Sequence, residues 1–401
     1  MTSLLILTVG TGTSGKYSDV AQGLANTIRL VQPRKFWLVP SASEESTPVA
    51  DLIRETVADL CCFQPWTDSN HYHAIPRHDD IHECRSIVRE VIAAARQELR
   101  PDEKLIVNPT SGTKQMSAGA TLAALDEEVD RIDFTSGERV EGVVKTGTEV
   151  VQSFDLRGFL FQRDLRIAAE LFHHGAFYAA ARLLKGYAQP KALRARETAL
   201  CLHEWQRMNY AKAATHAAKL SETLRLRLKA LAEADAFSVS VLGDLLAGAD
   251  ELLSWGDCEE ALARYYRGAE QAAKVRLADA HSIRPPYRIE DILNILPAGC
   301  RVAEDLQRLK HGSGEIYLTA LKVWEVLDAC RDPMARDYFA DQKLQDGLRR
   351  RNESMYGHGK EPVETAQVQA VCDRLRILIR AHLPAALACW TTESRPSSLT
   401  D

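Results

Sequence analysis

The sequence of 401 residues lacks several features that mark common classes of protein. No stretch approaches the roughly 20 apolar residues that a membrane-spanning helix needs, and the first residues show neither the basic start nor the cleavage site of a signal peptide. The nine cysteines include no CxxC pair, which argues against a zinc site. The net charge of −5 argues against a protein that coats nucleic acid by bulk attraction. We therefore expect a cytoplasmic protein with reduced cysteines, no membrane contact and no metal ion or cofactor, whose contacts with nucleic acid are local.

The residues that are present, 45% hydrophobic and 26% charged, are those of a packed protein, and the length implies two or three domains. Up to Asp155, apolar strand patterns alternate with helical ones, which predicts an α/β domain with a doubly wound parallel sheet. After Asp155, Ala, Leu, Arg and Glu recur at helical spacing, which predicts an all-α remainder. The expected order is an α/β domain over residues 1–155, a helical middle domain over 156–255, a second helical domain over 256–390 and a disordered polar tail over 391–401.

Two segments of the predicted helical region resemble each other. The segments "HHGAFYAAARLL" and "RMNYAKAATHAAKL" carry a small turn residue, an aromatic residue and several alanines in the same order, with Gly175 and Asn209 separated by 34 positions. This pattern resembles tetratricopeptide repeats, but ordinary antiparallel helical hairpins produce it as well. Both interpretations predict helices that are paired by short turns.

Two polar turns follow strands of the predicted sheet and precede helices. The first, "GTGTS", contains Gly10, Thr11, Gly12, Thr13 and Ser14, and it matches neither a P-loop nor a dinucleotide-binding fingerprint. The second, "NPTSGTK", contains Asn108, Thr110, Ser111, Gly112, Thr113 and Lys114. Ligands of such sheets collect beyond the carboxyl ends of the strands, where hydroxyls and backbone N–H groups suit phosphate or ribose oxygens. The simpler alternatives are a tight turn for the first segment, and for the second a helix N-cap by Thr110 or Ser111 with Lys114 in solvent.

The two turns, about one hundred residues apart, resemble those of the CARF domain, the Rossmann-like sensor of CRISPR-associated type III systems. The resemblance implies a dimer that binds cyclic oligoadenylate across its two-fold axis. Residues 10–14 and 108–114 would then line the pocket, where mainly neutral donors would meet the repeated phosphates and ribose hydroxyls of the ring. Cyclic tetra-adenylate and cyclic hexa-adenylate require the same donor types, so the sequence leaves the ring size of the activator open.

The stretch "RNESMYGHG", residues 351–359, brings catalytic residue types together near the C-terminus. If this segment is helical, Arg351 and His358 share one face two turns apart, and the neighbouring glycines loosen the end of the helix. A guanidinium that holds a phosphate and an imidazole that exchanges a proton are the minimum set for transesterification of RNA without a metal ion. Asn352 can orient either group, and Ser354 adds a further donor. The alternative is a solvated helix face or a structural turn.

The same stretch resembles the RN…HG signature of HEPN ribonucleases, whose Arg-to-His gap is variable. In the CARF–HEPN ribonucleases of type III CRISPR antiviral defence, the HEPN domain is helical, C-terminal and dimeric, and two Arg/His pairs form one composite site. The resemblance therefore implies that Arg351 and His358 are catalytic, that Asn352 supports them and that the protein is a homodimer. Arg349 and Arg350 would hold the RNA backbone, or they would lie at a solvated helix end.

The segment "HYHAIPRHDDIHE" is rich in residue types that bind metal ions. It contains His71, His73, His78, Asp79, Asp80 and His82. Their spacing fits no standard metal site, so we interpret the segment as a surface loop, which could cover the ligand pocket.

These patterns together predict a homodimeric endoribonuclease that cyclic oligoadenylate activates by an allosteric change. It would cleave single-stranded RNA without a metal ion and leave a 2′,3′-cyclic phosphate and a 5′-OH. Two alternatives remain open. A sensor or adaptor without nuclease activity would bind the ligand and leave RNA intact. A ring nuclease would degrade the ligand in the N-terminal domain, with Thr11, Ser14 or Lys114 positioning a ribose 2′-OH for in-line attack.

Overall fold

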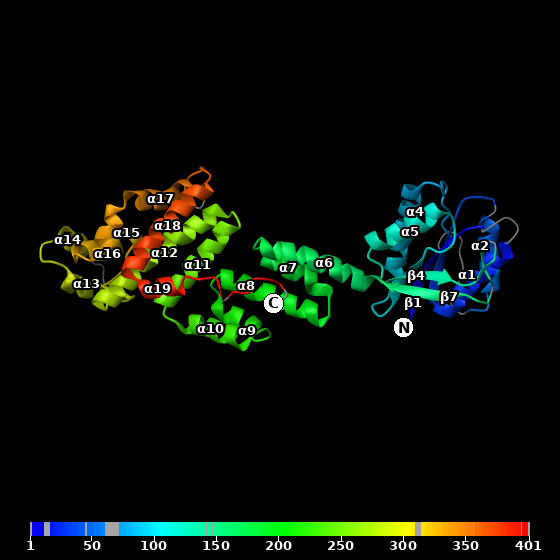
Figure 1. Ribbon diagram of the computed structural model, residues 1–401, viewed down its shortest axis with the longest axis horizontal. Coiled ribbons are helices and arrows are strands. Elements are labelled where there is room, and N and C mark those ends of the chain that lie inside the picture. The colour runs from blue at the N-terminus through cyan, green and yellow to red at the C-terminus, as the bar shows by residue number, and fades with distance from the viewer. Residues whose placement is uncertain are drawn as a thin grey trace. The chain divides into compact units, whose positions relative to one another are not determined.

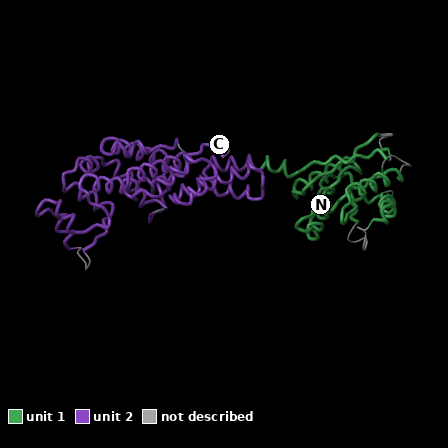
Figure 2. Tube along the Cα trace, turned by 90° about the horizontal axis from the view of Figure 1, so that it is seen from below, with its two compact units in different colours: residues 1–163 green, residues 164–401 purple. Residues whose placement is uncertain are grey.

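A computed structural model describes residues 2–11, 17–44, 46–60, 72–140, 143–145, 147–308, 314–355, 357–393 and 395–399. The chain consists of two compact units, Met1–Arg163 and Asp164–Asp401, which Figure 2 shows in different colours. No helix among the described residues combines the length and the apolar character needed to cross a membrane.

The N-terminal unit is built on a five-stranded sheet, of which Figure 1 labels β1, β4 and β7. Its strands are β1 (Ser3–Val9), β2 (Lys35–Pro40), β3 (Lys104–Asn108), β4 (Arg131–Ser136) and β7 (Val150–Asp155), in the spatial order β2-β1-β3-β4-β7. The first four strands are parallel, and β7 pairs antiparallel with β4. A short hairpin of β5 (Arg139–Val140) and β6 (Val143–Val144) precedes β7. The predicted α/β fold with a mainly parallel sheet is confirmed, and β7 adds an antiparallel edge.

Helices cover both faces of this sheet, which explains the unbroken apolar run of β1. One face carries α1 (Tyr17–Val31) and α2 (Ser46–Thr56), and the other carries α4 (Ile81–Glu98) and α5 (Lys114–Asp126). Leu5 and Leu7 of β1 lie in the core with α1 and α2, whereas Leu4 and Ile6 lie in the core with α4 and α5. Successive side chains of a strand point to opposite faces, so every residue of β1 is buried.

The C-terminal unit is almost entirely helical. Its helices are α6 (Leu156–His173), which begins in the N-terminal unit, α7 (Phe177–Leu183), α8 (Pro190–Gln206), α9 (Tyr210–Ala217), α10 (Glu222–Glu233), α11 (Val239–Ser254), α12 (Cys258–His281), α13 (Ile289–Ile295), α14 (Arg301–Arg308), α15 (Ala320–Ala329), α16 (Pro333–Ala340), α17 (Gln342–Glu353), α18 (Thr365–His382) and α19 (Pro384–Cys389). A 3₁₀ turn (Leu184–Gly186) follows α7, and β8 (Tyr287–Arg288) pairs with β9 (Glu315–Ile316).

The expected domain boundary at residue 255 does not separate two cores. Leu246 and Leu252 of α11 belong to the same hydrophobic core as Leu262 and Tyr265 of α12, together with residues of α15, α17 and α18. The helices on both sides of residue 255 are therefore packed as one body. The end of the sheet does fall at Asp155, but the N-terminal unit continues into α6.

The two similar helical segments are hairpins that share one kind of turn. The second residue after the first helix of each hairpin has a positive φ, 73° at Gly175 and 58° at Met208. In each, the next backbone N–H donates to a carbonyl five residues earlier, from Ala176 to Leu171 at 2.8 Å and from Asn209 to Glu204 at 2.9 Å. This is the Schellman arrangement, which satisfies the last carbonyls of a helix. The same pair of features recurs at Gly256 and Arg331, so the turn is a general device of this unit.

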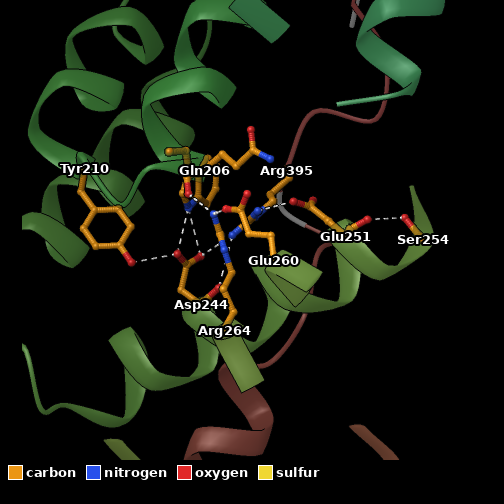
Figure 3. Close-up of polar contacts among 9 residues, drawn as sticks. Gln206, Tyr210, Asp244, Glu251, Ser254, Glu260, Arg264 and Arg395 are labelled. Carbon is orange, nitrogen blue, oxygen red and sulfur yellow. Dashed lines mark hydrogen bonds and ion pairs between the residues drawn. The ribbon is translucent and has the colours of Figure 1, made fainter. Parts of the chain in front are cut away.

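Described residues of the polar tail, which the sequence predicts to be disordered, pack against the helices. Arg395 and Leu399 are buried. Figure 3 shows the Arg395 guanidinium between the carboxylates of Asp244 and Glu251 on α11, and its Nη2 lies 3.2 Å from Asp244 Oδ1. Its central carbon lies 4.8 Å from the ring centroid of Trp205 on α8. A polar sequence cannot reveal this order, because a distant pair of buried carboxylates provides the partner for the arginine.

Candidate functional site

Arg351 and His358 do not lie on one helix. Arg351 and Asn352 lie in the last turn of α17, which ends at Glu353, and Ser354 is extended with φ −83° and ψ 172°. His358 follows in the loop after the helix. The expectation that a spacing of seven residues places both side chains on one helical face is therefore wrong.

The loop nevertheless returns His358 to the end of α17. The backbone N–H of His358 donates to the carbonyl of Asn352 at 2.9 Å, and the N–H of Gly359 donates to the carbonyl of Ser354 at 3.3 Å. The buried hydroxyl of Ser354 donates to the carbonyl of Arg351 at 2.8 Å. Ser354 thus holds the turn together and is not the donor for a substrate that the sequence suggested. Arg351, Asn352 and His358 are brought together by backbone bonds of one short segment.

Both glycines of the segment are required by close approach of the backbone. A Cβ at Gly359 would lie 1.6 Å from the carbonyl oxygen of Glu353, and a Cβ at Gly357 would lie 2.5 Å from that of Arg351. Real Cβ atoms do not approach other atoms closer than about 3.0 Å. Any other residue would push the loop, and His358 with it, away from the helix end.

The charge of Arg351 has no acidic partner in the part of the chain that the structure describes. Its guanidinium lies over the ring of Tyr266 on α12, 5.5 Å from the ring centroid, and Nη1 lies 3.4 Å from Asn352 Oδ1. Among the described residues no carboxylate forms an ion pair with Arg351, whereas Arg349 pairs with Asp346 at 3.2 Å. His358 is exposed. The segment therefore presents a charged arginine in the last turn of the helix and an accessible imidazole in the loop that returns to it, and such groups can hold a phosphate and transfer a proton.

The two polar turns of the N-terminal unit meet at the carboxyl ends of β1 and β3. The N–H of Gly10 donates to Ser111 Oγ at 3.0 Å. A Cβ at Gly10 would lie 2.4 Å from the Cα of Gly112, which itself has a φ of 117°. The structure thus brings these two turns into direct contact. Thr11 belongs to the described part of the first turn, and Gly12, Thr13 and Ser14 lie outside the described residues.

Several polar side chains of the second turn are used to build it. Asn108 is buried and donates to Thr135 Oγ1 at 3.0 Å, and its Oδ1 accepts from the N–H of Thr110 at 3.1 Å. Thr113 caps α5 by accepting from the N–H of Met116, and its hydroxyl donates to the carbonyl of His78 at 2.7 Å. The N-cap is therefore Thr113 and not Thr110 or Ser111. Lys114 is exposed at the start of α5.

Sequence reasoning missed a third polar turn at the same edge of the sheet. Ser41, Ser43 and Ser46 follow β2, and their hydroxyls contact one another, with 2.6 Å between Ser41 Oγ and Ser46 Oγ. Beside it, Thr47 Oγ1 lies 2.8 Å from the hydroxyl of Tyr72. The run "SASEES" directly after an apolar strand was the signal that could have indicated this turn.

The described part of the histidine-rich segment lies against this edge. The N–H of His73 donates to the carbonyl of Leu38 in β2 at 3.1 Å, and the carbonyl of His78 accepts from Thr113. Burial lowers the pKa of His73, partly offset by Glu90. His71 lies outside the described residues. Among those described, no three histidine, cysteine or acidic side chains gather as ligands of a metal ion.

Comparison with known proteins gives matches for the C-terminal domain and for the fold. Residues 231–381 match the family model described as the Csm6 HEPN domain. The fold resembles that of Enterococcus italicus Csm6 bound to cyclic hexa-2'-fluoro-hexa-dAMP, with a TM-score of 0.62 over 96% of this chain and 95% of that chain. The sequence identity is 11%, so this likeness concerns the fold. No curated protein matches the chain. The matched HEPN segment contains Arg351, Asn352 and His358.

Proposed function

We propose that this chain, which carries a HEPN domain of the Csm6 family on the CARF–HEPN fold, is an endoribonuclease activated by cyclic oligoadenylate. The observation that carries the proposal is the turn at the end of α17. It holds Arg351, with no carboxylate partner among the described residues, next to the exposed His358 within a domain of a ribonuclease family.

The proposed reaction is attack of a ribose 2′-OH on the adjacent phosphorus. The 2′ oxygen forms a bond to phosphorus, the bond from phosphorus to the 5′ oxygen breaks, and a 2′,3′-cyclic phosphate and a 5′-OH result. One proton leaves the 2′-OH and one reaches the 5′ oxygen, so one imidazole acts as base and another as acid. Arg351 would stabilise the charge on the phosphate and Asn352 would orient it. Two copies of the chain supply two imidazoles, which supports a homodimer with a composite site.

The N-terminal unit supplies the proposed sensor. The turns after β1 and β3 touch each other and present backbone N–H groups, hydroxyls and Lys114 at one edge of the sheet. These groups fit the phosphates and ribose hydroxyls of a cyclic oligoadenylate. The ligand named for the similar structure is a cyclic hexanucleotide analogue, and both cyclic tetra-adenylate and cyclic hexa-adenylate remain candidates here. Residues 10–14 and 108–114 are the proposed pocket, in which Asn108 and Thr113 shape the wall.

The test is cleavage of a fluorescent single-stranded RNA in EDTA, with no ligand, with cyclic tetra-adenylate and with cyclic hexa-adenylate. We expect one ring to start cleavage by the wild type and His358→Ala to abolish cleavage while it still binds that ring. His174→Ala, a substitution at an exposed histidine outside the HEPN segment, is the matched control and should cleave like the wild type. Retained cleavage by His358→Ala would refute the catalytic assignment. Binding of a ring without any cleavage would favour the adaptor alternative.

A further inference from the structure

Besides Asn352, the side chain of Arg351 contacts the ring of Tyr266, which comes from another helix. Tyr266 lies on α12, next to Tyr265, whose buried hydroxyl donates to Asp250 Oδ1 at 2.6 Å and fixes this part of the helix. Tyr266 is half-buried and packs against the hydrophobic core that α12 shares with α17. The Arg351 guanidinium lies over its ring, 5.5 Å from the centroid.

A stacked pair of aromatic side chains lies close to Tyr266. Tyr338 stacks on Trp324 with 4.0 Å between ring centroids and 3° between planes. Burial, together with the neighbouring Tyr266 hydroxyl, raises the pKa of Tyr338 to about 12. Tyr266 therefore lies close to a stacked aromatic pair and packs against the same core, which gives Arg351 a partly buried ring surface.

Contact with an aromatic ring leaves the charge of a guanidinium available to the substrate, whereas contact with a carboxylate does not. Nearby arginines are held by acids: Arg374 pairs with Asp341 at 2.8 Å and Arg376 with Asp250 at 2.6 Å. Such a partner orders the side chain but neutralises its charge. The face of an aromatic ring attracts a guanidinium through its quadrupole and carries no net charge. Arg351 can therefore be ordered on Tyr266 and still offer its whole charge, and the donors along its edge, to a phosphate.

We propose that Tyr266 is a positioning residue for RNA cleavage, which orders the guanidinium of Arg351 by a cation–π contact without neutralising it. This inference rests on the proposed function, because it assigns Tyr266 to the same site. Tyr266 acts through Arg351 and need not touch the RNA. The ring face is the required feature, and the hydroxyl is not.

The test compares Tyr266→Phe, Tyr266→Leu and Tyr266→Met in the full chain, with Tyr178→Leu as a matched control at an exposed tyrosine on α7. The readouts are kcat and KM for single-stranded RNA under activating conditions, the melting temperature and binding of the cyclic oligoadenylate. We expect Tyr266→Phe to keep kcat within about twofold. The variants without a ring should lose about threefold to thirtyfold in kcat, equivalent to about 0.7–2 kcal/mol. Binding of the cyclic ligand should not change. Met provides a second flexible apolar replacement if Leu fails to fold.

The outcomes separate this inference from the proposed function. If the wild type cleaves and the folded Leu or Met variant cleaves within twofold of it, the positioning role is refuted and the nuclease stands. If Phe loses as much activity as Leu, the hydroxyl matters rather than the ring face, and the inference is again refuted. A wild type that binds the cyclic ligand and cleaves no RNA would refute the proposed function and the inference with it.

Discussion

Gly359→Ala tests whether the turn after α17 sets the position of His358. The added Cβ would lie 1.6 Å from the carbonyl oxygen of Glu353, so this separation must increase to at least 3.0 Å before the chain can close. The opposing atom is backbone in the last turn of a packed helix, so the loop must move rather than the helix. His358 is the preceding residue, and a displacement of about 1 Å at a catalytic group costs on the order of 100-fold in rate. The strain itself should cost about 1–3 kcal/mol of stability.

The assay is the initial rate of RNA cleavage at a saturating concentration of the activating ring, with melting temperature and ligand binding measured on the same preparations. Gly158→Ala on α6 is the control, because no atom lies within 4 Å of the Cβ that it adds. We expect Gly359→Ala to bind the ring normally, melt a few degrees lower and cleave about 100-fold more slowly, and Gly158→Ala to cleave like the wild type. Cleavage by Gly359→Ala within threefold of wild type would show that the close contact does not position His358.

Two further predictions concern the packing of each unit. Arg395→Ala leaves the buried carboxylate of Asp244 and the half-buried one of Glu251 without this cation, which should cost about 3–5 kcal/mol and lower the melting temperature by roughly 6–20 °C. Arg380→Ala, at an exposed arginine, should change the melting temperature little. Equal melting temperatures of the two variants would contradict a stabilising role of the Arg395 ion pairs. In the N-terminal unit, Arg34 lowers the pKa of Glu103 to about 2. Above pH 5 the pair should therefore stabilise the fold by about 3 kcal/mol at most. This contribution should be lost as the pH falls towards 2. Glu103→Gln should therefore destabilise the chain at pH 7 and not at pH 2, and an equal difference in unfolding free energy at both values would refute this.

The N-terminal sheet could be predicted from sequence because its signals are local. The apolar run of β1 and the alternation of strands with helices follow from burial on both faces. The meeting of the turns at Gly10 and Ser111 follows from the parallel pairing of β1 with β3. The sequence could not show which polar side chains of the second turn are used within the protein. Asn108 and Thr113 form hydrogen bonds with backbone and side-chain groups that the fold brings close.

The errors in the C-terminal unit have a common cause, which is that the deciding partners lie far away in the sequence. Arg395 is ordered by residues about 150 positions earlier, and the boundary at residue 255 disappears because α11 packs against later helices. His358 stays a predicted catalytic residue, but its expected place on the helix was wrong because periodicity assumes that a helix continues. The extended conformation of Ser354 ends α17, and backbone bonds to the helix end then position the histidine.

The close packing of this turn bears on how a ligand could control the reaction. Within one chain, the backbone N–H of His358 is bonded to the end of α17 at 2.9 Å, and residue 359 lies too close to the helix for any side chain. A ligand bound elsewhere can therefore change the conformation within a single turn only a little. The proposed reaction, however, uses one imidazole as base and another as acid, and one turn provides one of them. We therefore expect activation to change the relation between the turns of two copies, which requires that the cyclic ligand binds the active arrangement of the pair more tightly than the inactive one.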